Sequence, residues 1–131
     1  MFERTIPASL DQLSAIGDAI LAAIASLDVA DKEQTAYGVQ LAVHELLVNV
    51  IEHGYAGQHG EIGVCFSAEN NQFITTITER GKKFDRAAVA TPNFDDLQVR
   101  GFGLYLIDEL MDDVHYESQQ GVNRWRLTKQ L

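Results

Sequence analysis

A polar stripe interrupts an otherwise apolar stretch in the middle of the sequence. Glu45, Asn49 and His53 recur at every fourth residue within LAVHELLVNVIEHG, so a helix places them along one face. An amide oxygen suits Mg²⁺, and a carboxylate can orient or deprotonate a hydroxyl or a water. The stripe indicates either such a site or an ordinary solvated helix face. A zinc-protease motif starting at His44 is excluded, because Val48 stands where the second histidine must be.

A short charged segment, ERGKKFD at 79–85, directly follows a predicted strand. Gly81 allows the backbone to approach a ligand closely, and Glu79 at the strand end could accept hydrogen bonds from an exocyclic amine. Taken alone, the same residues also fit a charged turn on the surface. The segment is therefore a candidate binding loop that depends on support from other features.

Two glycines, Gly101 and Gly103, precede a predicted helix in RGFGLYL at 100–106. Small residues leave the amides of the first helical turn uncovered, and these amides attract phosphate oxygens together with the helix dipole. The Rossmann fingerprint does not fit, because its third glycine is missing and no strand of a parallel βαβ unit leads into the glycines. The Walker sequence is absent, because neither lysine nor Ser/Thr follows them. The segment predicts an anion site of another kind.

Hydropathy periods predict the elements that must position these three features. The expected elements are a strand at 2–6, helices over about 9–27 and 32–53, a hairpin over 61–79, a helix that begins after Gly103 and ends near Met111, and a hairpin over 114–127. Residues 80–100 have no sustained period, and a loop of this length in a compact domain is often a functional lid. We predict a single α+β domain over 1–131, with the layers of a two-layer sandwich. On the last strand, Trp125 has the alternation of a core residue.

The composition is that of an ordered, acidic protein. Among 131 residues, 46% are hydrophobic, and 10 Lys and Arg against 19 Asp and Glu give a formal net charge of −9. This charge argues against unspecific binding to nucleic acid or to an anionic membrane. The charge is uneven: residues 80–100 contain five basic and three acidic side chains and carry +2, which leaves −11 for the rest. The negative charge is thus relieved beside the predicted phosphate site.

Cysteine use and the N-terminal residues indicate a cytoplasmic protein. The single Cys65 cannot form an internal disulfide, and we expect a buried small side chain there rather than a nucleophile. MFERTIPASL lacks the layout of a signal peptide, and no apolar run is long enough for a membrane span.

The three features, taken together and in this order, resemble the Bergerat-fold ATP-binding superfamily of gyrase-type topoisomerases, heat-shock chaperones and histidine kinases. Glu45, Asn49 and His53 match its N-box, residues 79–85 its first glycine box and residues 101–106 its second. Two segments, VHELLVNVIEHGY and RGFGLYLIDELMDDVHYE, are similar to the corresponding segments of the anti-sigma-factor serine kinases of the RsbW and SpoIIAB type. The resemblance spans nearly the whole chain and implies a mixed, mostly antiparallel sheet covered on one face by helices.

The resemblance implies a role for each matching residue. Asn49 would ligate Mg²⁺, Glu45 would act as or assist the base, and Glu79 would read the adenine of ATP. Gly81 would lie close to the adenine, and the phosphates would lie at the second glycine box beneath a lid formed by 80–100. The other residues expected to contact the nucleotide are His53, Lys83, Phe84, Arg100, Gly101, Gly103 and Leu104.

The implied function is that of an ATP-dependent protein serine/threonine kinase. Such proteins are cytoplasmic homodimers that bind a sigma factor and phosphorylate a serine on a small anti-anti-sigma (STAS) protein. Two positions depart from the pattern: Glu79 stands where Asp is usual, and Lys83 where a second glycine is usual. They motivate an alternative, a non-catalytic module of the same fold that sequesters a protein partner, with nucleotide absent or merely structural. A third hypothesis is that the chain is the detached ATPase domain of a histidine kinase.

Overall fold

The computed structural model describes residues 1–84 and 100–131, with the backbone alone for residues 100–104. In chain order the elements are β1 (Phe2–Pro7), a 3-10 turn η1 (Leu10–Gln12), α1 (Leu13–Ala25), α2 (Lys32–Asn49), a π-helical turn η2 (Val50–Gly54), β2 (Glu61–Glu69), β3 (Gln72–Glu79), α3 (Arg100–Leu110), β4 (Asp113–Gln119) and β5 (Val122–Gln130).

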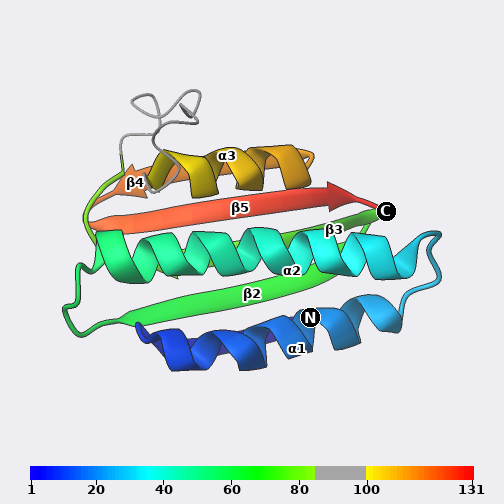
Figure 1. Cartoon of the computed structure of the whole chain (residues 1–131), viewed down its shortest axis with the longest axis horizontal. Helices are drawn as coiled ribbons and strands as arrows, with labels where there is room; N and C mark the ends of the chain where they lie inside the picture. The colour runs from blue at the N-terminus through cyan, green and yellow to red at the C-terminus, as the bar shows by residue number, and fades with distance from the viewer. Residues whose placement is uncertain (85–99) are drawn as a thin grey trace.

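The strands form one sheet in the order β1-β2-β3-β5-β4. All four neighbouring pairs among these strands are antiparallel, so the predicted mixed component of the sheet is not found. The helices lie side by side on one face of the sheet, with α2 between α1 and α3 (Figure 1). The α+β two-layer sandwich predicted from the sequence is thereby confirmed.

The core lies between the helical layer and the sheet. Alternate residues of β2, Ile62, Val64 and Phe66, are buried, as the period of two requires. The central helix α2 contributes the largest share from the helical layer, through Ala36, Val39, Ala42, Val43, Leu46 and Leu47. Because α2 is flanked by a helix on each side, it buries a wide face, and any polar group on that face is held in a fixed place.

Several element boundaries differ from the prediction. The first predicted helix is divided into η1 and α1, and the second changes from α- to π-helical geometry after Asn49. The third helix begins at Arg100, so Gly101 and Gly103 belong to its first turn and do not precede it. Cys65 is only half-buried, because it alternates with Val64 and Phe66 and lies on the face of β2 away from the core.

Most of the predicted lid, residues 85–99, lies outside the described residues. The described part of the loop, 80–84, is attached to the body of the domain by backbone amides. Lys82 N–H donates to Gly54 O (2.7 Å), and Phe84 N–H donates to the Tyr116 hydroxyl (2.9 Å). No described helix is long and apolar enough to cross a membrane.

Candidate functional site

The amide of Asn49 is oriented by its own helix. Its Nδ2 donates to the backbone carbonyl of Glu45, one turn earlier, at 2.9 Å, and both residues are half-buried on α2. This hydrogen bond leaves Oδ1 without a protein donor among the described residues. An amide oxygen fixed in this way can accept from a ligand or coordinate a hard cation.

The third member of the predicted stripe lies in different backbone geometry. His53 belongs to η2, where Tyr55 N–H donates to Val50 O (2.8 Å). A π-helical turn contains more residues per turn than an α-helical one, so the four-residue stripe does not continue unchanged from Asn49 to His53. His53 is half-buried and engaged in an interaction within the domain.

The first glycine box is pressed against the end of η2. A Cβ added to Gly81 would lie 2.6 Å from Gly54 C and 2.8 Å from Gly54 O. The next amide in the chain, Lys82 N–H, donates to the same carbonyl. The sequence predicted that Gly81 is small so that a ligand can approach; the structure shows that it already meets the backbone of Gly54 in close contact.

The acid at the end of β3 is held by three internal donors. Glu79 is 3% exposed, and its Oε1 accepts from Gly81 N–H (2.7 Å) and from Asn123 Nδ2 (2.8 Å). Its Oε2 accepts from the indole Nε1–H of Trp125 (3.2 Å). An ionised carboxylate offers about four acceptor positions, so one position on Oε2 is left for a further donor.

Asn123 connects this acid to the glycine-box loop. It is 1% exposed, and its Nδ2 also donates to Gly81 O at 2.9 Å. Its Oδ1 accepts from the hydroxyl of Tyr116 (3.2 Å), which in turn accepts from Phe84 N–H. Both ends of the 81–84 loop are thus bonded to the β4–β5 hairpin through buried polar groups.

Aromatic rings surround the network. Trp125 contacts Tyr116 with ring centroids 4.4 Å apart, and Phe84 contacts Trp125 at 5.7 Å. Trp125 is buried, as its alternation on the last strand predicted. Because these rings exclude water, each hydrogen bond to the buried Glu79 is stronger than it would be on the surface.

Tyr55 holds the opposite side of the loop. Its hydroxyl donates to Glu61 O (2.5 Å) and accepts from Arg80 N–H (2.9 Å). Gly60 lies against the ring, because a Cβ there would overlap with Tyr55 Cε1. The strand end, the glycine box and the turn after η2 therefore form one bonded unit.

The remaining predicted contacts lie at two places. Lys83 is exposed on the loop. Four other residues predicted to contact the nucleotide belong to the N-terminal part of α3, next to α2: Arg100, Gly101, Gly103 and Leu104. The first four amides of a helix have no intrahelical acceptor, so this end of α3 presents N–H groups suited to an anion.

The sequence did not indicate four residues of this unit as site residues: Tyr55, Tyr116, Asn123 and Trp125, the last of which was expected only to cover the core. A signal for Asn123 exists, since positions 123, 125 and 127 share one face of the last strand and the first of them is polar. A polar residue at a core-facing position requires a buried partner. The partner, Glu79, lies 44 residues away and is set opposite by the β3–β5 register.

Comparison with known proteins gives a family match and several relatives. The model of the histidine kinase-like ATPase domain matches residues 6–129. The serine-protein kinase RsbW of Oceanobacillus iheyensis is 32% identical over 93 residues, which cover 64% of this chain and 59% of that protein. RsbW of Staphylococcus epidermidis is 31% identical over 93 residues, covering 63% of this chain and 58% of that protein. The chain therefore spans less than two thirds of the length of these relatives.

Solved structures agree on the fold. The RsbU and RsbW domains of a Mycobacterium tuberculosis protein superpose with a TM-score of 0.65 at 16% identity, covering 100% of this chain and 33% of that one. A histidine kinase domain from Erythrobacter litoralis gives a TM-score of 0.59 at 18% identity, covering 96% of this chain and 62% of that one. With the family model matching almost the entire chain, the protein belongs to the histidine kinase-like ATPase domain family.

Proposed function

We propose that the protein binds Mg-ATP beside α2 and the N-terminal end of α3 and phosphorylates a serine of a STAS-type partner. In this proposal it is a cytoplasmic, homodimeric partner-switching regulator that also binds a sigma factor. The observation that carries the proposal is the orientation of Asn49, whose Nδ2 is bonded to Glu45 O so that Oδ1 is available. The similarity to RsbW kinases supports the choice of reaction.

Each residue of the site has a separate role in the proposed reaction. Bound Mg-ATP supplies the transferable phosphoryl group and the cation that neutralises its charge. Asn49 Oδ1 fits the cation, because Mg²⁺ accepts one or two protein oxygens and otherwise keeps water and phosphate ligands. Glu45, on the same side of α2, accepts the proton of the serine hydroxyl. The first-turn amides of α3 donate to phosphate oxygens.

In this proposal, Glu79 recognises the adenine base of ATP. Two of its internal donors occupy Oε1 and one occupies Oε2, so an exocyclic amine has one position open on Oε2. The internal bonds fix the carboxylate before any ligand arrives, which lowers the ordering cost of binding.

A second function is favoured by the same carboxylate. Glu79 is 3% exposed and already accepts three hydrogen bonds from within the domain. The buried carboxylate therefore needs no nucleotide as a hydrogen-bond partner. A non-catalytic module that sequesters its protein partner needs no more than this. The two functions differ in whether phosphate is transferred, because the non-catalytic module either binds no nucleotide or holds it without transfer.

Titration calorimetry with Mg-ATP tests the proposal. The wild type should bind, Asn49→Ala should bind at least about tenfold more weakly, and the difference should shrink in EDTA. Gln34→Ala, an exposed position on α2, is the matched control and should bind as the wild type does. Equal binding by wild type and Asn49→Ala contradicts the role of Asn49 in holding Mg²⁺.

Labelled ATP and a STAS protein then separate the two functions. Transfer of the γ-phosphate to a STAS serine supports the kinase. A stable complex with the STAS protein that forms without phosphate transfer, whether or not ATP binds, supports the non-catalytic module. Sedimentation equilibrium of the same sample measures whether the protein is a homodimer.

A further inference from the structure

The outer surface of α1 has few charged side chains for a face in contact with solvent. The 13 residues of α1 include one charged side chain, Asp18. Two large apolar side chains that line one groove are exposed, Tyr37 (63%) and Leu10 (49%), and a third, Leu21 (37%), is exposed on α1. Exposed apolar groups gathered on one face indicate an interaction surface, because scattered single residues are the normal case.

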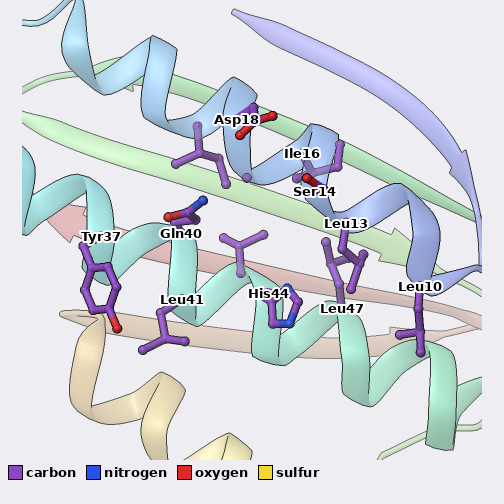
Figure 2. Close-up of a pocket in the computed structure, with 13 residues that line it drawn as sticks. Leu10, Leu13, Ser14, Ile16, Asp18, Tyr37, Gln40, Leu41, His44 and Leu47 are labelled. Atoms are coloured by element: carbon purple, nitrogen blue, oxygen red, sulfur yellow. The ribbon is translucent and has the colours of Figure 1, made fainter.

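A groove follows the seam between the two helices, with a volume of about 420 Å³. The helices approach closely at its centre, where a Cβ added to Gly17 would lie 2.8 Å from Gln40 Nε2. Figure 2 shows Gln40 between the helices, Tyr37 and Leu41 along one end, and Leu10 at the other. The groove contains none of the residues assigned to the nucleotide.

The charged side chains on the α1 side of the groove are acidic. No Lys or Arg occurs from Thr5 to Asp31, while four aspartates do, among them Asp11 and Asp18 on the α1 side. Asp18 lines the groove, and Asp11 follows directly after Leu10. An occupant with an apolar ridge and cationic flanks would complement both properties.

We propose that this groove docks a basic amphipathic helix of a protein partner. A helix that places apolar residues at i, i+3, i+4 and i+7 would lay them between Tyr37 and Leu10, and its lysines or arginines would lie beside Asp18 and Asp11. A second copy of this chain is a poorer occupant, because its own groove is acidic and each copy carries −9. The proposal does not depend on nucleotide binding or phosphate transfer.

The test uses synthetic peptides of about five helical turns and the full chain labelled with ¹⁵N. The probe peptide has leucines on one face and lysines elsewhere. One control peptide replaces every lysine with glutamate, and another keeps the composition but scrambles the leucine spacing. We expect the probe alone to shift amide resonances, with the shifts concentrated on α1 and α2.

Variants locate the binding on the protein. Tyr37→Ser should weaken binding of the probe at least about tenfold, as removal of an aromatic anchor does at other interfaces. Tyr105→Ser is the matched control, since Tyr105 is an exposed tyrosine (37%) on α3. The affinity of this variant for the probe peptide should stay within about twofold of the wild type. Asp18→Asn should lower the affinity for the probe peptide and reduce the dependence of that affinity on salt concentration. Asp113→Asn on β4 should change neither quantity.

Three results would overturn the proposal. The first is a set of shifts spread over the sheet or equal losses in Tyr37→Ser and Tyr105→Ser, which would mean unspecific attraction to an acidic protein. The second is equal binding of the scrambled peptide. The third is a dimer that Tyr37→Ser dissociates, which would assign the groove to a second copy.

Discussion

Replacing Gly81 with alanine tests whether this glycine is required by the fold or by a ligand. The added Cβ would lie 2.6 Å from Gly54 C, about 0.8 Å inside the roughly 3.4 Å of ordinary contact. The obstacle is backbone, so the loop must move away, and the bond from Lys82 N–H to Gly54 O is stretched. Overpacking of this kind costs about 1–3 kcal/mol and the lost hydrogen bond about 0.5–1.5 kcal/mol.

The expected loss in the free energy of unfolding is therefore about 2–4 kcal/mol without any ligand. For a chain of this size the melting temperature should fall by roughly 5–15 °C. Urea denaturation followed by far-UV circular dichroism measures the free energy, and differential scanning calorimetry measures the melting temperature.

Two other glycines provide controls. A Cβ on Gly63 would lie 3.7 Å from Thr78 Cβ, and one on Gly54 would lie 3.9 Å from Gly81 Cα, which are ordinary contacts. Both alanine variants should stay within about 0.5 kcal/mol of the wild type. If Gly81→Ala is equally stable and only its affinity for ATP falls, the glycine serves the ligand and the explanation from packing is refuted.

Further variants probe the buried network. Trp125→Phe keeps a ring but removes the donor to Glu79 Oε2, and should lower the free energy of unfolding in urea by about 1–3 kcal/mol; no loss would show that the indole bond contributes nothing. Asn123→Ala removes two donated bonds and leaves Glu79 partly unpaired, so a loss of about 3–5 kcal/mol is expected. Gln130→Ala, at an exposed position at the C-terminal end of β5, is the control. Tyr55→Phe should cost about 1–2 kcal/mol and speed amide exchange at Arg80, and unchanged exchange would contradict the anchoring role of the hydroxyl.

Local patterns predicted most of the elements. The apolar period of α2 and the alternation in β2 and β3 are properties of neighbouring residues, so they can be read without a structure. The end of α2 could not be read in this way. The chain changes to π-helical geometry at Val50, and the end of this turn meets the glycine-box loop, which lies about 30 residues further on.

The candidate site was predicted in part. Asn49 and Glu45 are related by one helical turn, and the structure keeps them together, with the amide bonded to the Glu45 carbonyl. That Glu79 accepts a hydrogen bond from an exocyclic amine of a ligand stays a prediction. The structure adds three internal donors to this carboxylate, from Gly81, Asn123 and Trp125, because β5 lies beside β3 in the sheet.

The sequence by itself determined the α+β class, the polar residues on α2, the two glycine-rich segments and the relief of negative charge over 80–100, since each rests on spacing or composition within one segment. Only the tertiary structure decided what these groups touch. Strand order brings Asn123 within 2.8 Å of Glu79, and the crossing of loop and helix brings Gly81 against Gly54. Such contacts join residues distant in the chain, and no local period encodes which of them meet.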